Sequence, residues 1–339
     1  MNLSICIVNW NVKDYLEDCL ESIYNNTNGF SFEVIVVDNH SKDGSREMVK
    51  EKFPRVKLIE NQRNLGFPAA NNQAIRQSIG KHLLFLNPDT VILPGTIQGI
   101  VEFMDTHPDA GIASCRKVEP DGGQIQEDYH PFSLRFLAKL RYTFWNELAK
   151  KFPRNTIVKN RLLDSFLFFF NPKTHQNESP FQIDFVQGSF LMTRQEIFKQ
   201  VGLFDQRFFH YGDDDDFCYR VRKQGWKVYF CPEFKIIHFI QKSMGQWDQK
   251  SQTDIKNFCS LLFYRKHKGK IKLFLWVIGR IILVFLIACV YLIFNLIPPK
   301  IKSTPIIKEK TSLKIIILSH IKNLFKVLMG ISPSLRQYE

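Results

Sequence analysis

The apolar run at residues 83–86, which ends at Asn87-Pro88-Asp89, constrains the fold more than any other stretch of the chain. Such a run is typical of a strand buried on both faces of a sheet, and Asn-Pro favours a turn at its end. Ligands of open α/β sheets bind just beyond the carboxyl ends of the strands. Asp89 is therefore well placed to hold a divalent cation and, through it, a phosphate. The alternative is that Asp89 only ends the strand or caps the element that follows.

Strand and helix patterns alternate through the first third of the chain. Apolar runs predict strands at 3–8, 32–37, 56–60, 83–86 and 110–115, with helices at 14–24, 68–79, 94–106 and one ending near 52. This alternation is typical of a parallel, doubly wound α/β sheet, whose right-handed crossovers put the strand ends on one edge. Asp38 follows the second strand, so we expect it to converge with Asp89. With the polar loop 61–64, these acids favour a nucleotide site.

Four consecutive aspartates at 213–216 begin another predicted helix. Carboxylates stabilise the N-terminal end of a helix, and their mutual repulsion raises the pKa of at least one of them. A carboxylate with a raised pKa suits a general base, although the run is also compatible with a solvated acidic helix start. His238 ends a later predicted strand. It is either a metal ligand or a histidine of the core.

The net charge of +13 and the pI of about 9.3 favour anionic partners such as nucleic acid, anionic lipid or phosphorylated ligands. Much of the excess charge lies beside apolar segments and no recognition motif appears, so we expect no nucleic-acid partner. The seven cysteines show no paired spacing and are typical of thiols in a reducing compartment. The N-terminus enters a strand directly, so no signal peptide is expected.

Residues 129–180 differ from the rest of the predicted domain in being rich in Arg, Lys and aromatic side chains and poor in acids. We interpret this stretch as an insertion of helices and loops within a catalytic domain of residues 1–264. Its composition fits an interfacial surface, and a lid with a solvated basic face fits equally well.

The composition changes again from Arg265 onward, which defines a second segment, 265–339. A basic block precedes a predicted apolar helix at 273–297, whose uninterrupted run of about 17 residues is near the lower limit for a membrane-spanning helix. The pattern at 313–329 predicts an amphipathic surface helix. We favour a re-entrant or in-plane membrane anchor with both ends in the cytoplasm, with a single span as the alternative, because basic residues flank both sides of the apolar run.

Taken together and in order, the motifs resemble the family 2 inverting glycosyltransferases, in particular their rhamnosyltransferase-like branch. The matching stretches are 5–11, 36–45, 64–71, 84–90, 188–192, 202–205, 213–216 and 237–238, which cover about residues 1–245. The resemblance implies a GT-A fold, a doubly wound mixed sheet that binds nucleotide-diphospho-sugars, here followed by the C-terminal membrane-associated helical segment.

The resemblance also implies roles in binding the donor. Asp38 matches the acid that reads the nucleotide base, and Asn64 and Gly66 match the loop beside the nucleotide. Asn87 stands where many members of the family have the first acid of an Asp-x-Asp motif, as is usual in this branch. Arg220 lies at the family's usual distance from the base, which implies contact with the donor diphosphate.

The metal ligands and the catalytic base are implied in the same way. Asp89 matches the metal-binding end of the Asp-x-Asp motif, and His238 stands where some members have a further metal ligand. The family's Glu-Asp pair falls on Asp213 and Asp214, which makes Asp214 the expected catalytic base. Asp213 in place of Glu departs from the pattern, and the register of the acidic run also allows Asp215.

The expected activity is a Mg²⁺- or Mn²⁺-dependent transfer of a sugar from a nucleoside diphosphate sugar to a hydroxyl of a lipid-linked saccharide. The expected place is the cytoplasmic face of the plasma membrane, in cell-surface polysaccharide synthesis. The resemblance favours rhamnose, while a hexose or an N-acetylhexosamine stays open. A sugar nucleotidyltransferase is the rival, but residues 9–12 do not form its glycine-rich phosphate loop. A non-catalytic membrane scaffold would not require acids at three strand or helix ends.

Overall fold

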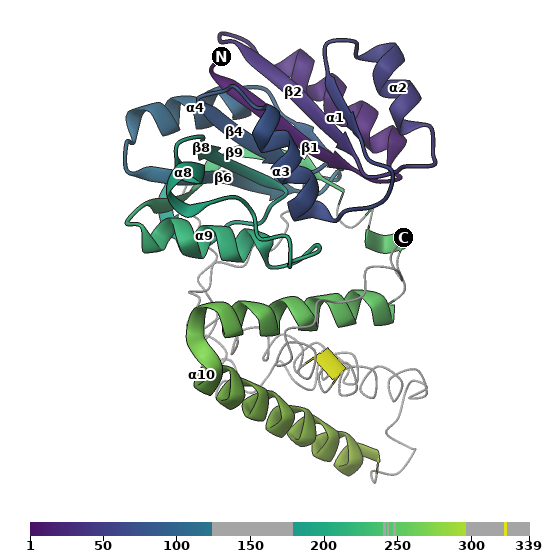
Figure 1. Ribbon diagram of the computed structural model, residues 1–339, viewed down its shortest axis with the longest axis vertical. Coiled ribbons are helices and arrows are strands. Elements are labelled where there is room, and N and C mark those ends of the chain that lie inside the picture. The colour runs from purple at the N-terminus through teal and green to yellow at the C-terminus, as the bar shows by residue number, and fades with distance from the viewer. Residues whose placement is uncertain (124–178, 240–241, 243, 247–248, 296–321, 324–339) are drawn as a thin grey trace. The chain divides into compact units, whose positions relative to one another are not determined.

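The computed structural model describes residues 1–123, 179–239, 242, 244–246, 249–295 and 322–323 (Figure 1). The described chain divides into two compact units, one ending at Gln246 and the other beginning at Gln249. The second unit thus begins before the boundary at Arg265 that the sequence suggests. Nearly all of the predicted insertion at 129–180 lies outside the described residues.

The N-terminal half of the sheet consists of four parallel strands in the order β3-β2-β1-β4. They are β1 (Leu3–Asn9), β2 (Phe32–Asp38), β3 (Lys57–Glu60) and β4 (His82–Leu86). The helices that connect or follow them are α1 (Lys13–Asn26), α2 (Ser45–Lys52), α3 (Phe67–Gln77) and α4 (Thr96–Thr106). Every residue of β1 and β4 is buried, as continuous apolar runs predict for parallel strands.

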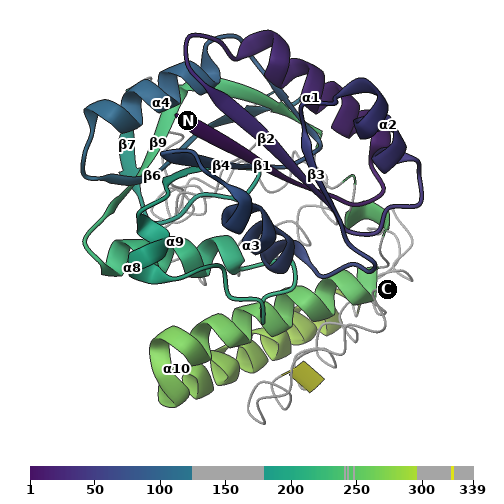
Figure 2. The ribbon, with the colours of Figure 1, turned by 45° about the horizontal axis from the view of Figure 1, so that its top comes forward.

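The second half makes the sheet mixed, as the family resemblance implies. Strand β8 (Phe190–Arg194) lies between β4 and β6 (Ala110–Val118) and runs antiparallel to both. Strand β6 pairs in parallel with β9 (Lys227–His238). The short strands β5 (Thr90–Ile92) and β7 (Phe181–Ile183) pair antiparallel with β9. Helices α1, α2 and α4 cover one face of the sheet, and α3, α8 and α9 cover the other (Figure 2).

An aromatic cluster holds the acidic helix α9 (Asp213–Lys223) and its neighbour α8 (Ile197–Val201) against β4. The Phe85 ring of β4 meets Phe204 edge-on at 5.0 Å, and Phe204 lies 4.8 Å from Phe217 of α9. Phe217 in turn stacks on Phe198 of α8 at 5.1 Å. All four rings are buried, so this packing determines where the first turn of α9 lies.

The second unit contains α10 (Gln249–Asn295), which is interrupted at Gly269, where the backbone has φ 79° and ψ 171°. The helix predicted at 273–297 is thus the later part of a longer element. Among the helices that the structure describes, none is both long enough and apolar enough to cross a membrane. Of the predicted amphipathic helix at 313–329, only residues 322–323 are described, and they are helical.

Candidate active site

Asp38 lies at the carboxyl end of β2, where its side chain is 1% exposed. One carboxylate oxygen accepts a hydrogen bond from Asn9 Nδ2 at 2.9 Å, and the other accepts from the Ser41 N–H at 2.8 Å. Arg46 Nε lies 3.5 Å from the second oxygen. Asp38 therefore organises the turn after β2. Asn9, a partner of Asp38 that the sequence alone does not identify, ends the first strand in register with Asp38.

The loop before α3 holds the two other residues expected beside the nucleotide. Asn64 Oδ1 accepts from the Gly66 N–H at 2.9 Å, and Gly66 O accepts from Asn39 Nδ2 at 3.3 Å. The next residue, Phe67, donates its N–H to Phe209 O at 2.9 Å. A Cβ on Gly66 would lie 2.6 Å from that same Phe209 oxygen. Glycine is therefore required where the loop approaches residue 209.

Asp89 and His238 come together through the pairing of β5 with β9, which places Thr90 opposite His238. His238 Nε2 lies 3.3 Å from one Asp89 oxygen, and the Lys242 N–H donates to the other at 3.3 Å. Burial raises the pKa of the Asp89 carboxyl, but its contacts with His238 and Lys242 outweigh burial and hold the pKa below its usual value. The turn itself is closed by Thr90 Oγ1, which donates to Asn87 O at 2.7 Å.

A carboxylate beside an imidazole is a donor pair that Mn²⁺ accepts, and Mg²⁺ sites commonly combine one carboxylate with phosphate and water oxygens. Asp89 and His238 therefore fit the implied cation as a partial ligand set. No group of three His, Cys, Asp or Glu side chains that could hold a metal occurs within the described part of the chain. Any such cation would need further ligands from the donor diphosphate or from water.

The four aspartates form the first turn of α9, which Gly212 precedes in a left-handed conformation. Asp213 and Asp216 are buried, whereas Asp214 and Asp215 are partly exposed. Burial, and then the charges of the neighbouring aspartates, raise the pKa of Asp213 well above its usual value. The repulsion expected within the run therefore contributes at Asp213, but it is second to burial.

Asp214, the expected base, is held by two backbone groups. One carboxylate oxygen accepts from the Gly188 N–H at 3.1 Å, and the other accepts from the Asp215 N–H at 2.8 Å. Gly188 lies two residues before β8, so this hydrogen bond places the carboxylate of Asp214 beside the start of a core strand. Gly188, which belongs to the matching motif 188–192, thus has a role that the motif alone did not indicate.

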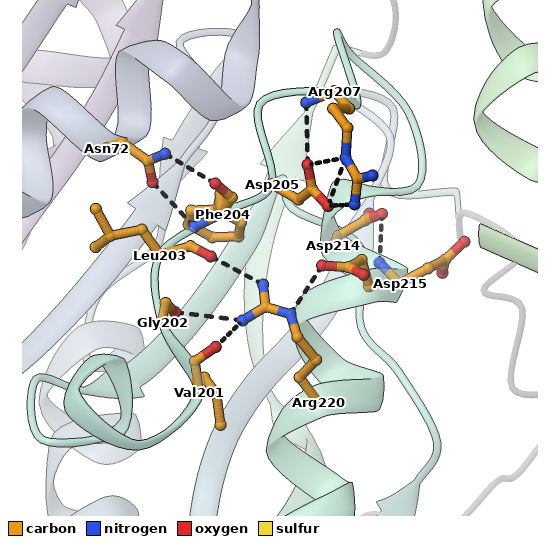
Figure 3. Close-up of polar contacts among 11 residues, drawn as sticks. Asn72, Val201, Gly202, Leu203, Phe204, Asp205, Arg207, Asp214, Asp215 and Arg220 are labelled. Carbon is orange, nitrogen blue, oxygen red and sulfur yellow. Dashed lines mark hydrogen bonds and ion pairs between the residues drawn. The ribbon is translucent and has the colours of Figure 1, made fainter. Parts of the chain in front are cut away.

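Arg220 points toward the loop after α8 (Figure 3). Its Nε donates to Asp216 at 2.8 Å, and Nη1 donates to Val201 O at 2.5 Å and to Gly202 O at 3.3 Å. Nη2 donates to Leu203 O at 3.0 Å. These contacts lie within the protein, and the expected contact of Arg220 with a diphosphate stays a prediction.

The expected residues other than Arg220 gather along one edge of the sheet. Asp38 ends β2, and β1 separates β2 from β4. Beyond the end of β4, the Asn87 N–H donates to Ser189 O at 3.2 Å, and the adjacent Gly188 holds Asp214. The strand ends thus bring together residues that are up to 176 positions apart in the sequence, from Asp38 to Asp214.

A segment after β9 adds residues that the sequence analysis did not identify. The Phe239 ring lies 5.1 Å from the ring of Tyr15 in α1, and Lys242 Nζ lies 5.2 Å from the same ring. Gln246 Nε2 donates to Asn11 O at 2.8 Å, in the turn after β1. Only individual side chains of this segment contact the β1–α1 turn and α1. Such contacts leave no periodic pattern in the sequence, so periodicity does not predict them.

A family model described as glycosyl transferase family 2 matches residues 4–202, more than half of the chain. The chain belongs to this family. A relative in Mycobacterium tuberculosis, an N-acetylglucosaminyl-diphospho-decaprenol L-rhamnosyltransferase, is 27% identical over 63% of this chain and 68% of its own length. Rhamnosyltransferase WbbL of Escherichia coli K12 is 25% identical over 69% of this chain and 82% of its own length.

Solved structures show the fold of this family 2 glycosyltransferase. A mannosyltransferase from Pyrobaculum calidifontis, determined in complex with GDP-Man and Mn²⁺, superposes with a TM-score of 0.57 over 96% of this chain and 87% of its own, at 14% identity. The mixed α/β sheet is therefore the GT-A fold, as the motifs imply. The protein is a glycosyltransferase of the rhamnosyltransferase-like branch, as the motifs imply. The membrane association expected of the C-terminal segment stays a prediction.

The Gly66 loop gives a testable prediction. Gly66 has φ 82° and ψ 165°, a region that only glycine adopts freely, whereas Gly44 caps α2 at φ 82° and ψ 13° with its nearest neighbour 3.9 Å away. We expect Gly66→Ala to lower the free energy of unfolding by about 3 kcal/mol or more, through strain plus the clash with Phe209. The matched control Gly44→Ala should cost about 1 kcal/mol. Urea unfolding measures both changes in the free energy of unfolding. Equal losses in the two variants would show that the close approach of Gly66 to Phe209 does not add to the cost of the substitution.

Proposed function

We propose that the protein transfers a sugar, with rhamnose as the first candidate, from a nucleoside diphosphate sugar to a hydroxyl of a lipid-linked saccharide in cell-surface polysaccharide synthesis. The observation that carries the proposal is the single sheet edge shared by Asp38, Asp89 and Asp214 in a family 2 glycosyltransferase. The name of the Mycobacterium tuberculosis relative supports both the sugar and the lipid-linked acceptor.

The donor would bind along the ends of the parallel strands. Asp38 and the Asn64–Gly66 turn would face the nucleoside, on the side of β2 and α3. Asp89 and His238 would hold Mg²⁺ or Mn²⁺, which when bound neutralises charge on the diphosphate as it leaves. Support for this part is the 3.3 Å approach of the carboxylate and the imidazole at the end of β9.

Asp214 would act as the general base. Its carboxylate removes the proton from the acceptor hydroxyl, and the acceptor oxygen attacks the anomeric carbon opposite the leaving group. The bond from that carbon to the phosphate oxygen breaks, the nucleoside diphosphate departs, and one displacement inverts the anomeric configuration. Asp213 is a poorer candidate because it is buried and its raised pKa favours the protonated form. Asp214 is partly exposed, and the Gly188 N–H orients it.

Replacement of the base tests this mechanism. We expect Asp214→Asn to lower kcat by about 10²–10⁴-fold, because the amide cannot accept the proton, while nucleotide binding is retained. The matched control is Asp215→Asn, which makes the same change one residue along the same helical turn and should retain most activity. The readout is release of nucleoside diphosphate from a panel of nucleotide sugars with a lipid-linked acceptor. Near wild-type turnover by Asp214→Asn, with loss in Asp215→Asn, would shift the base to Asp215.

The cation site gives a second prediction. Asp89→Ala should weaken the Mn²⁺-dependent binding of a nucleoside diphosphate by roughly tenfold or more, because a charged ligand is lost. Asp109→Ala is the control, since Asp109 is 44% exposed, pairs with Lys227 and lies at the opposite edge of the sheet. Calorimetric titrations with and without Mn²⁺ measure the effect. Identical metal dependence in wild type and Asp89→Ala would remove Asp89 from the ligand set.

The lipid side of the proposal rests on a stripe of exposed apolar residues that follows the break in α10. Ile271 is 78% exposed, Phe274 62%, Leu275 61% and Ile278 37%, while Leu273 is fully buried. Their spacing of three and four residues puts them on one helix face, and the basic block 265–272 overlaps the start of this stripe at Ile271. An apolar face beside basic residues fits the surface of an anionic bilayer. The proposal therefore locates the enzyme at the cytoplasmic face of the plasma membrane.

Charge placed in the stripe tests the membrane contact. We expect Phe274→Glu/Leu275→Glu to weaken sedimentation with vesicles of anionic phospholipid at least tenfold, because burial of each apolar side chain in the interface is worth about 1.5–3 kcal/mol. The control Gln206→Glu/Gln224→Glu adds the same charge at two exposed polar positions of the first unit. Equal retention of all three proteins on the vesicles would rule out the stripe as the contact.

A further inference from the structure

We propose that Arg220 is a positioning residue. It links the first turn of α9, which carries Asp214, to the loop 202–205 by hydrogen bonds. Asn72 in turn links that loop to helix α3 on the donor side. Arg220 would act on the reaction through the placement of the base, without touching the donor. This inference rests on the proposed function and deepens it, because it assigns a residue that sets the geometry between the base and the donor.

The first link joins Arg220 to the acidic turn. Asp216 is fully buried, and its carboxylate accepts from Arg220 Nε at 2.8 Å across one helical turn of α9. Arg220 itself is 16% exposed and lies over the Phe217 ring at 5.5 Å. Loss of either partner of such a pair leaves the other charge buried without compensation. Asp214 and Asp216 share the first turn of α9, so a shift of Asp216 also moves Asp214.

The second link joins Arg220 to the end of α8. The last carbonyl groups of a helix lack partners within the helix, and here Arg220 Nη1 donates to Val201 O and to Gly202 O. Arg220 Nη2 donates to Leu203 O in the loop that follows (Figure 3). One planar guanidinium thus bridges a buried carboxylate and three consecutive carbonyl groups. A lysine has no planar fork with which to span these groups.

The third link continues from the loop to α3. Asn72 Nδ2 donates to Phe204 O at 2.9 Å, and Asn72 Oδ1 accepts from the Phe204 N–H at 3.0 Å (Figure 3). Helix α3 begins directly after Gly66, in the loop expected beside the nucleotide. A continuous set of hydrogen bonds therefore runs from the donor-side helix to the turn that carries Asp214.

The same contacts argue against a role in binding the donor. A guanidinium has five N–H donors, and four hydrogen bonds to protein atoms already engage Arg220. One Nη2 N–H is left over, so a bidentate grip on a diphosphate would require Arg220 to give up at least one of its protein partners. Positioning is sufficient to matter for the rate, since a displacement of about 1 Å in a reacting group costs roughly 10²-fold.

The test compares Arg220→Met and Arg220→Lys with the control Arg207→Met. Arg207 is 55% exposed, pairs with Asp205 at the end of the same loop and makes none of the hydrogen bonds that link Arg220 to α8 and Asp216. We expect Arg220→Met to lower kcat at saturating substrates by roughly 10²-fold, while the Kd for nucleoside diphosphate and the donor KM change less than about threefold. Arg220→Lys should regain part of the loss through its charge opposite Asp216. Arg207→Met should behave as wild type.

Two results would overturn the inference. In the first, donor affinity falls tenfold or more while kcat is retained, which would assign Arg220 to the diphosphate. In the second, kcat is unchanged in both Arg220 variants. If Arg220→Met does not fold, Arg220→Lys alone decides by the same criteria, with its thermal unfolding measured beside the wild type. Transfer by the wild type is measured first, and its absence with every donor would reject the proposed function itself.

Discussion

The antiparallel pairing of β4 with β8 is the interaction on which the arrangement of the site depends. Its register sets Leu86 opposite Phe190, so the end of one strand lies beside the start of the other. Just beyond that pair, Asn87 donates to Ser189, and the neighbouring Gly188 donates to Asp214. A slip of one residue would exchange the two faces of β8 and separate these groups.

Burial of carboxylates is the main electrostatic problem of this site, because a buried charge needs a partner or a proton. The protein solves it differently at each position. Asp38 accepts from an amide and a backbone N–H, Asp89 lies beside His238, and Asp216 pairs with Arg220. Asp213 instead has a raised pKa, which favours its neutral form. Asp214 keeps partial exposure within the same run, the condition that a base acting on a substrate requires.

The parallel half of the sheet could be predicted because its signals are local. Each of the strands β1, β2 and β4 is a nearly continuous apolar run, and Asn9, Asp38 and Asn87 end or follow them. The antiparallel half was less predictable. Strands β5 and β7 have three residues each, too few to show a period, and β8 has only five.

The alternation of strands and helices, the edge at which Asp38 ends β2 and Asp89 follows β4, and the acidic start of α9 can all be derived from the sequence alone. The partners of the charged groups follow only from the packing of the folded chain. This packing sets His238 beside Asp89 and directs Arg220 to Asp216 and the end of α8. Hydrophobic periodicity indicates which face of a helix or strand is buried, and nothing more. The partner of a charge depends on the packing of elements that are distant in the chain.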